Sequence, residues 1–406
     1  MNELNAKLQA VTKKKSGVTR LTLTDFRNYK NLRIAAQISP IIITGENGSG
    51  KTNILEAISF LTPGRGLRST KLADIKRIHP ADDTNILAAD AWSIAAEILK
   101  NDESYIIGTA LQKIRHEEVS DTEDEIHSFE RRIVKINQQK ITQQAELGKY
   151  ISAIWITPQM DRLFQGGPQP RRSFLDRLVY AFDLEHAKRT AAFEHLYRQW
   201  FQMLKSGTTD KYWLQSVEAD MSALGVAIAA ARRELIARLN TFIIHEPDDV
   251  FPDVRLELDG LIEKMLDSES ALNVEDFYTA NLAKNRRNVM QNESVEGINR
   301  TDFKVFFKKK NMPADLCSTG EQKALLVSII LAQTKCQILD RGFAPILLLD
   351  EVTTHLDDTK RDALLDKIRN LQLQAWITST EEQNFSLLKN DAQFLRVSNG
   401  IVTPLL

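Results

Sequence analysis

Apolar and polar residues alternate near the start of the chain, and this period of two predicts β-strands. Residues 18–29 alternate in this way, and residues 40–44 form a short β-branched run typical of a buried strand. A glycine-rich stretch over 45–53 then opens an apolar segment, 54–61, that we expect to be helical. The order of strand, turn, strand, glycine loop and helix is typical of the start of an α/β domain.

Three further segments alternate in the same way, at 91–100, 104–113 and 131–140. The last contains an Asn-Gln-Gln turn that indicates a hairpin, so we expect an antiparallel β layer in this part of the chain. Residues 116–130 are acidic and poor in apolar side chains, which predicts an exposed loop.

Beyond Phe174 the apolar period lengthens to nearly four, the spacing of a helix face. One face consists of Phe193, Leu196, Trp200 and Leu204. A second, longer face consists of Leu214, Val217, Met221, Leu224, Ile228, Leu235 and Leu239. The intervening stretch, 205–211, has turn composition, so the two helices are predicted to pack antiparallel as an arm.

The helical pattern stops at 246–254, and one more helix-like stretch covers 272–290. The α/β pattern returns at 344–352, and a final apolar strand is expected near 375–380. The predicted fold is therefore α/β, with a head that is split in the sequence.

The chain has 406 residues, more than the ~250 to 300 that a single core usually reaches, so two domains are expected. We place the head at 1–176 together with 297–406, and an inserted, mostly helical arm at 177–296.

The composition describes an ordinary globular chain, with 43% apolar and 26% charged residues. Its net charge of -1 means that any DNA binding must come from local basic patches. The two cysteines, Cys317 and Cys336, are too few for a disulfide framework, which favours a cytoplasmic protein. No signal sequence or membrane-length apolar run is present, so no membrane partner is expected. The lysines at 13–15 fit either a basic arm or a solvated, frayed terminus.

The glycine-rich stretch fits the phosphate-binding pattern GxxxxGK[ST] and lies between a strand and a helix, as that motif requires. Its members are Gly45, Glu46, Asn47, Gly48, Ser49, Gly50, Lys51 and Thr52. Glycines let the backbone N–H groups surround an anion, Lys51 would reach the β- and γ-phosphates of ATP, and Thr52 would bind Mg²⁺. The alternative is a chance glycine turn before a helix.

Residues 346–351 form an apolar strand that ends in two carboxylates, as expected at the edge of a parallel sheet where ligands bind. Asp350 would hold Mg²⁺. Glu351, one residue further on, is placed to act as the general base that polarises water.

Residues 317–323 open another apolar helix with Ser318 and Gly320, a second arrangement that can bind an anion. A simple helix cap explains this turn equally well. The stretch also resembles the LSGGQ signature of ABC-type ATPases, which completes the nucleotide site of a second subunit. That resemblance implies an ABC-type head, nucleotide contacts from Ser318, Gly320 and Gln322, and hydrolysis in a dimer.

Two more segments resemble this superfamily. Residues 154–159 are similar to the strand that leads into the Q-loop, which makes Gln159 a further Mg²⁺ ligand by resemblance. Residues 355–357 match the D-loop position, and 378–380 stand where many such ATPases carry a switch histidine. This chain has hydroxyl side chains there instead.

The chain resembles the RecF family along most of its length. The matching segments are FRNY at 26–29, GRGLRS at 64–69, the Gly-Pro-Arg-Arg-Phe-Leu-Asp pattern at 166–176, Gly-x-x-Arg-x-Asp at 297–302 and DEVTTHLD at 350–357. The chain departs from the family at Met160, where an acid is usual, and at 298–299, where Pro-His is usual.

This resemblance implies an ATP-dependent DNA-binding protein of recombinational repair and replication restart. It implies an ATP-induced homodimer on double-stranded and single-stranded DNA at gapped junctions, weak DNA-stimulated ATPase activity, recombinase loading with RecO and RecR, and a role in the SOS response. The physical candidates for DNA contact are Arg65, Arg68, Lys71 and the lysines at 308–310, with a solvated charged surface as the alternative. Arg171 and Arg172 are expected to be structural residues or residues of the nucleotide lobe rather than DNA ligands.

Two other functions stay open at this point. The chain could be a scaffold that binds ATP as a structural ligand, or the ABC-type ATPase of another DNA or defence system.

Overall fold

The computed structural model describes residues 2–79, 87–88, 91–115, 128–207, 210–245, 248–291 and 295–405. The chain divides into two compact units, Met1–Pro158 with Gln337–Leu406 and Gln159–Cys336. The domain bounds expected from the sequence stay a prediction. The predicted acidic loop lies almost wholly outside the described residues, since these break off between 115 and 128. Of the helices in the described ranges, none has the length and apolar character of a membrane span.

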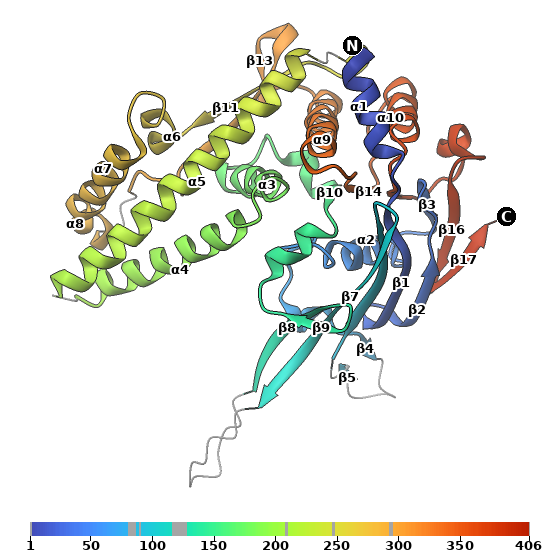
Figure 1. Cartoon of the computed structure of the whole chain (residues 1–406), viewed down its shortest axis with the longest axis horizontal. Helices are drawn as coiled ribbons and strands as arrows, with labels where there is room; N and C mark the ends of the chain where they lie inside the picture. Colours follow the sequence, from blue (N-terminus) through green and yellow to red (C-terminus); the bar gives the residue numbers. More distant parts are fainter. Residues whose placement is uncertain are drawn as a thin grey trace. The chain divides into compact units, whose positions relative to one another are not determined.

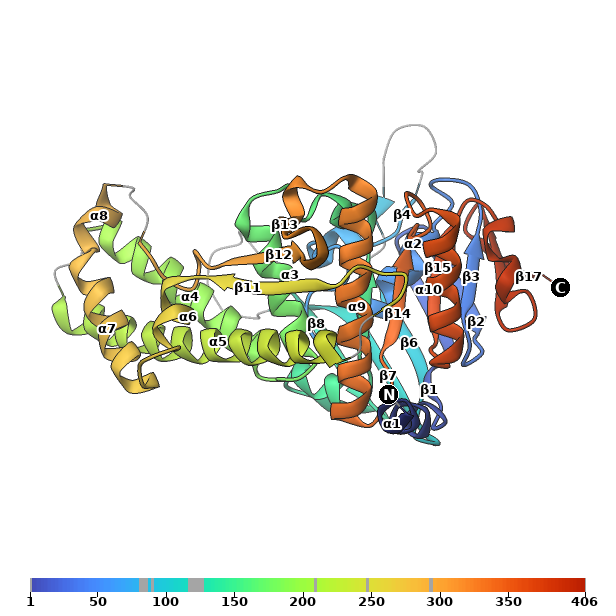
Figure 2. The ribbon, with the colours of Figure 1, turned by 90° about the horizontal axis from the view of Figure 1, so that it is seen from above.

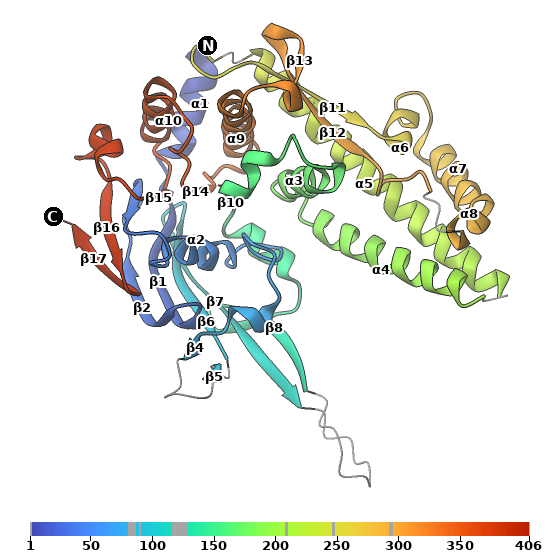
Figure 3. The same ribbon diagram turned by 180° about the vertical axis from the view of Figure 1, so that it is seen from behind.

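The first unit contains an antiparallel sheet of six strands in the order β2-β1-β6-β7-β8-β9, which confirms the predicted β layer (Figure 3). The strands are β1 (Ser16–Phe26), β2 (Tyr29–Ala35), β6 (Ser93–Lys100), β7 (Glu103–Arg115), β8 (Ser128–Ile136) and β9 (Gln139–Ile141). The expected hairpin is present between β8 and β9, and Asn137 and Gln138 form its turn with positive φ angles of 48° and 69°. A small hairpin pairs β4 (Ile78–His79) with β5 (Leu87–Ala88).

A second sheet in the same unit has the order β10-β14-β15-β3-β16-β17 (Figure 2). Its strands are β10 (Ala153–Ile156), β14 (Ile346–Asp350), β15 (Ala375–Ser379), β3 (Ile41–Thr44), β16 (Gln393–Ser398) and β17 (Ile401–Leu405). All neighbours are parallel except β16 and β17. The prediction that the strand near 375–380 is the last was wrong, because β16 and β17 follow it at the edge of the sheet.

Three helices accompany these sheets: α1 (Asn2–Thr12), α2 (Lys51–Ser59) and α10 (Asp358–Asn370). Helix α2 contacts β1 of one sheet and β14 and β15 of the other, and its residues from Ile54 to Ser59 are buried. The N-terminus is helical, and Leu8 of α1 is buried. The placement of α2 puts its first turn at the carboxyl edge of the parallel sheet.

The second unit is built mainly of helices (Figure 1). They are α3 (Pro168–Tyr180), α4 (His186–Lys205), α5 (Lys211–His245), α6 (Leu261–Met265), α7 (Ala271–Lys284), α8 (Arg286–Met290) and the larger part of α9 (Thr319–Arg341). Helices α4 and α5 run side by side, as their two apolar faces predict, and Trp200 of one donates its indole N–H to Glu218 of the other at 2.9 Å. The predicted stretch 272–290 forms α7 and α8.

This unit also contains an antiparallel sheet in the order β11-β12-β13, which the sequence analysis did not predict. Its strands are β11 (Val254–Asp259), β12 (Asp302–Phe307) and β13 (Met312–Pro313). The strands are short, and β11 and β12 are separated by three helices in the sequence. Six 3₁₀ segments complete the described elements: η1 (Leu72–Ile75), η2 (Gln144–Lys149), η3 (Pro158–Arg162), η4 (Lys308–Lys310), η5 (Ala314–Leu316) and η6 (Gln383–Leu388).

Candidate nucleotide-binding site

The glycine loop joins β3 to α2, and three of its glycines have positive φ angles. Gly48 has φ 79° and Gly50, the residue that precedes α2, has φ 113°. A Cβ atom on Gly50 would lie 2.4 Å from the side chain of Asn28, and one on Gly45 would lie 2.2 Å from the carbonyl of Val397. The backbone conformation therefore favours glycine at all three positions, and the close neighbours also exclude a side chain at Gly45 and Gly50.

Lys51 begins α2, and its ammonium group lies over the loop that precedes it. Its Nζ donates to the carbonyls of Gly45 at 2.8 Å and Glu46 at 2.9 Å. Burial lowers the pKa of Lys51, whereas the charges of Glu351 and Asp350 act in the opposite direction. The lysine and the two acids thus share one electrostatic environment.

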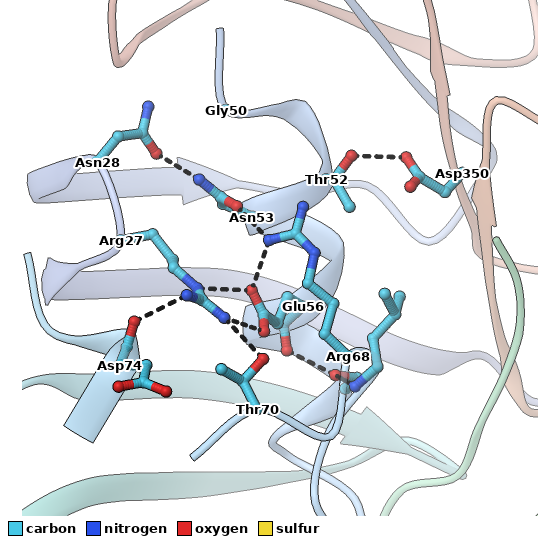
Figure 4. A network of polar contacts seen from close by, with 12 residues as sticks. Arg27, Asn28, Gly50, Thr52, Asn53, Glu56, Arg68, Thr70, Asp74 and Asp350 are labelled. Carbon is cyan, nitrogen blue, oxygen red and sulfur yellow. Dashed lines mark hydrogen bonds and ion pairs between the residues drawn. The ribbon is translucent and has the colours of Figure 1, made fainter. Parts of the chain in front are cut away.

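Thr52 and Asp350, which lie far apart in the sequence, meet at this site (Figure 4). Thr52 Oγ1 donates to Asp350 Oδ1 at 2.8 Å. Thr378, at the end of the neighbouring strand β15, donates to the same oxygen at 2.7 Å, and its own oxygen accepts the backbone N–H of Glu351 at 2.9 Å. Glu351 has a positive φ of 48°. The expected pair of acids is therefore assembled with the glycine loop.

The loop also contains an oxygen that fits a phosphate ligand. Ser49 Oγ is buried and has no hydrogen-bond partner among the described residues. A buried polar atom without a partner costs free energy, and an anion seated in the loop would provide one. This orphaned hydroxyl, together with Lys51 and the glycine backbone, fits the triphosphate of a nucleotide.

The FRNY segment supports the loop from outside, a role that sequence reasoning missed. Asn28 Nδ2 donates to the carbonyl of Ser49 at 3.0 Å, and Tyr29 Oη donates to that of Gly50 at 3.0 Å. Burial raises the pKa of Tyr29, so its hydroxyl stays protonated and remains a donor. Phe26 anchors the segment in the core, with its ring edge-on to Trp92 at 5.8 Å.

Glu56 is a fully buried acid on α2, and two arginines neutralise it (Figure 4). Arg27 donates to its two oxygens at 2.9 and 2.6 Å, and Arg68 donates at 3.1 Å. Arg68 also donates to Asn53 Oδ1 at 2.8 Å. A charged residue among apolar ones on a helix was the signal in the sequence, because a buried acid requires a cation. Arg68, a candidate for DNA contact, is thus paired with Glu56, although the residue is exposed like two other candidates, Arg65 and Lys71.

In the second unit, Ser318 precedes α9 as the predicted helix cap. Its Oγ accepts from the backbone N–H of Glu321 at 3.3 Å, and the carboxylate of Glu321 accepts from Ser318 N at 2.9 Å, which is a capping box. A hydrogen bond from Lys310 and others from Ser318 lower the pKa of Glu321 to about 2. Gln322 Nε2 donates to the carbonyl of Cys317 at 2.8 Å. The cap is therefore present, and the signature role of Ser318, Gly320 and Gln322 stays a prediction.

The remaining predicted positions lie near segment ends. Gln159 is exposed in η3, directly after β10, so the expected strand is confirmed and the Mg²⁺ role of Gln159 stays a prediction. Asp357 precedes α10 and accepts from the backbone N–H of Lys360 at 2.9 Å. The lysines at 308–310 are exposed, and Lys310 contacts Glu321.

The chain matches the family model of the RecF/RecN/SMC N terminal domain over residues 17–403. It is 39% identical over 388 residues to the DNA replication and repair protein RecF of Rhizobium rhizogenes, which covers 95% of this chain and 98% of that protein. The protein of the same name from Agrobacterium fabrum is 38% identical over 391 residues, 96% of this chain and 99% of its own. This chain belongs to the RecF family.

The fold agrees with that family. The solved structure of the recombination mediator protein RecF-ATP in the RecFOR pathway has a TM-score of 0.77 at 19% identity, over 97% of this chain and 98% of that one. The RecF-ATPrS structure of the same pathway has a TM-score of 0.78 at 18% identity, with coverage of 97% and 99%. These likenesses confirm the predicted α/β fold of an ATPase head with antiparallel β layers and helices.

Two RecF-family segments that were noted only as resemblances hold the second unit together. Arg171 pairs with both oxygens of Asp302 at 2.7 and 2.9 Å, and Arg172 donates to the carbonyl of Thr301 at 2.9 Å. A Cβ on Gly297 would lie 2.3 Å from the hydroxyl of Tyr278. These contacts give the two arginines a structural role within the second unit and explain the glycine by close packing.

Proposed function

We propose that this chain is an ATP-binding protein that acts in DNA replication and repair. The observation that carries the proposal is the hydrogen bond between Thr52 of the glycine loop and Asp350 of β14, which joins the two halves of an ATP site. Lys51 and Glu351 belong to the same group of charges. The choice of process is supported by the name of the relatives, DNA replication and repair protein RecF. The choice of nucleotide is supported by the solved structure of RecF-ATP.

The residues of the site fit a triphosphate with Mg²⁺. The loop and Lys51 would hold the phosphates, and Thr52 and Asp350 would hold the metal ion, since hydroxyl and carboxylate oxygens are ligands that Mg²⁺ prefers. When bound, Mg²⁺ neutralises charge on the β- and γ-phosphates. Gln159 as a further ligand rests on the resemblance to ABC-type ATPases alone.

The hydrolytic step assigned to the site is slow and stimulated by DNA. Glu351 accepts a proton from the water that attacks the γ-phosphorus, and ADP leaves as its bond to that phosphorus breaks. Lys51 stabilises the negative charge on the transferred group.

The signature segment would act on the nucleotide of a second copy of the chain, so that ATP favours a homodimer. Ser318 and Gly320 open α9, where backbone N–H groups and one hydroxyl are suited to an anion. Ser318 Oγ contacts Glu321 in the single chain, at 3.0 Å. A phosphate of the nucleotide bound to the partner copy would therefore take the place of the Glu321 carboxylate as the acceptor for the Ser318 hydroxyl.

DNA at gapped junctions, RecO and RecR are the partners that we assign to the dimer, and the cytoplasm is its location. The solved structure of RecF-ATP is described as part of the RecFOR pathway, and this supports the choice of partners. Arg65 and Lys71 in the first unit and the exposed lysines at 308–310 are the candidate phosphate contacts.

The test is binding of the full chain to a gapped duplex with ATP, with ADP and without nucleotide, at two salt concentrations. We expect ATP to strengthen binding and to shift sedimentation toward a dimer, and both Lys51→Met and Ser318→Arg to lose these effects. The controls are Lys188→Met and Ser268→Arg, which change exposed residues of the second unit. Binding that ignores the nucleotide would contradict the proposed role at DNA.

A further inference from the structure

Thr378 stands at the carboxyl end of β15, directly opposite Asp350 in the parallel pairing with β14. Its side chain is fully buried, at 0% exposure. The hydroxyl donates to Asp350 Oδ1 at 2.7 Å and accepts the backbone N–H of Glu351 at 2.9 Å. One hydroxyl group thus donates its proton to the carboxylate of Asp350 and accepts, through a lone pair, the backbone N–H of Glu351.

The contact fixes the Asp350 carboxylate without removing its charge. Oδ1 accepts two hydroxyl protons, from Thr52 at 2.8 Å and from Thr378 at 2.7 Å. Hydroxyl groups carry no charge, so neither contact brings a countercharge to Asp350, and its Oδ2 is the oxygen that neither hydroxyl engages. This arrangement orients the second oxygen for a cation.

The contact also holds the backbone at Glu351. Its φ of 48° is in the left-handed region. This conformation costs free energy for a residue with a side chain, and it persists only where neighbouring contacts offset that cost. The hydrogen bond from Glu351 N to Thr378 is such a contact, and the direction of the Glu351 side chain follows from the backbone conformation.

We propose that Thr378 is a positioning residue for ATP hydrolysis, which sets Asp350 for the metal ion and Glu351 for the attacking water with one hydroxyl. The inference rests on the proposed function of the site. Thr378 is β-branched, so its χ1 angle is restricted and the hydroxyl is held in one place within the strand. Valine would keep the shape but leave the Glu351 N–H without this acceptor and Asp350 without this donor.

The experiment compares the full chain with Thr378→Val, Thr378→Ser and Thr378→Cys. For each protein, kcat and KM for ATP, the Kd of ATP with Mg²⁺ and with EDTA, and the melting temperature are measured. We expect valine to lower kcat by about 10- to 100-fold, because small displacements of catalytic groups have effects of that size, and KM to change by less than about threefold. Serine should restore kcat to within about threefold of wild type, since it retains the hydroxyl.

The Mg²⁺ dependence of ATP binding gives a readout that does not depend on turnover. Wild type and the serine variant should bind ATP more tightly with Mg²⁺ than with EDTA, and valine should reduce that difference. Thr44→Val is the matched control, because Thr44 is a buried threonine at the end of the neighbouring strand β3 and donates to the carbonyl of Leu395 at 3.4 Å. It should show wild-type Mg²⁺ dependence and a similar change in melting temperature. Cysteine keeps a weak donor and replaces valine if the valine variant does not fold, with about tenfold loss of kcat expected.

The outcomes separate the two levels of the proposal. If the wild type neither hydrolyses ATP nor binds it in a Mg²⁺-dependent way, the proposed function fails. If the wild type does both and the valine variant keeps its kcat and its Mg²⁺ dependence, the role of Thr378 is overturned while the proposed function stands. A serine variant as impaired as valine would overturn it as well, because the hydroxyl would then not be the operative group.

Discussion

Asp350, at the end of β14 in the first unit, and Asp176, within α3 of the second, are both shielded carboxylates, but their partners differ. Asp176 accepts two hydrogen bonds from the Arg232 guanidinium at 2.8 and 2.9 Å and one from His186 Nε2 at 2.9 Å. Asp350 accepts hydrogen bonds from the hydroxyls of Thr52 and Thr378. A bidentate guanidinium neutralises a carboxylate within the fold, whereas hydroxyls orient it and leave its charge available to a ligand. The partners therefore separate a structural acid from a functional one.

Glu56 tests this distinction within the first unit, since it lies on α2 close to Thr52 in the sequence. Two guanidinium groups, from Arg27 and Arg68, contact its carboxylate. By the same argument Glu56 is structural, although it belongs to the helix that follows the phosphate-binding loop.

The largest expected effect is on the stability of the second unit. Arg232→Met would leave Asp176 and Glu263 buried without their cation, and removing one partner of a buried ion pair costs about 3 to 5 kcal/mol. Hydrogen exchange of the α5 amides measures the loss. The control is Arg233→Met, whose partner Asp267 is largely exposed, and here we expect less than about 0.5 kcal/mol. Equal effects of the two variants would show that burial of the pair does not matter.

The second effect is on catalysis without loss of stability. Asp350→Asn keeps an oxygen that can accept from Thr52 and Thr378 but removes the negative charge, so we expect ATP hydrolysis to fall by about 100-fold or more. Thermal unfolding should change less than after loss of a carboxylate paired with guanidinium groups, because no ion pair among the described residues is broken and the buried Lys51 keeps the second nearby carboxylate, Glu351. Glu56→Gln provides the contrast: it leaves two guanidinium groups short of a charge and should lower the melting temperature more than Asp350→Asn does. The reverse order would remove the distinction between the two acids.

The parts of this site that the sequence predicted are those with local patterns. The glycine loop and the strand ending in Asp350 and Glu351 each fall within a few consecutive residues, where spacing and apolar runs are visible. The contacts of Thr378 and of Asn28 could not be predicted, because their partners are set by the pairing of distant strands. For the same reason β11 and β12 were missed: β11 pairs with β12 across the intervening helices, a contact that no local pattern in the sequence shows.

The third expected effect is a loss of stability in acid. Burial by itself would raise the pKa of Asp176, but the Arg232 charge and the hydrogen bonds from His186 and Arg232 outweigh it and lower the pKa to about 2. A carboxylate with a depressed pKa stabilises the folded state at a pH above its pKa in the unfolded chain, ~3.8. This contribution to the unfolding free energy, about 2 kcal/mol, is lost as the pH falls through 2. The measurement is the unfolding free energy of the second unit between pH 4 and 2.

Surface acids titrate over the same interval and must be separated from Asp176. Hydrogen bonds from Lys264 and Lys304 lower the pKa of Asp259 to about 2, but these partners are exposed, so added salt should suppress their effect. The pH dependence of the unfolding free energy that persists in added salt is assigned to Asp176. Its persistence in Asp176→Asn would show that another group is responsible.

The smallest effect concerns the contact between Tyr29 and the phosphate-binding loop. Tyr29→Phe removes the donor to the carbonyl of Gly50 and leaves the aromatic ring in the core, and one such hydrogen bond contributes about 0.5 to 1.5 kcal/mol. The Kd for ATP should therefore rise by about 2- to 10-fold, because the loop loses a contact that holds its shape. Tyr105→Phe is the control, since the Tyr105 hydroxyl contacts Glu103 on the surface. An unchanged Kd in Tyr29→Phe with a lowered melting temperature would mean that FRNY supports the core of this unit and not the nucleotide loop.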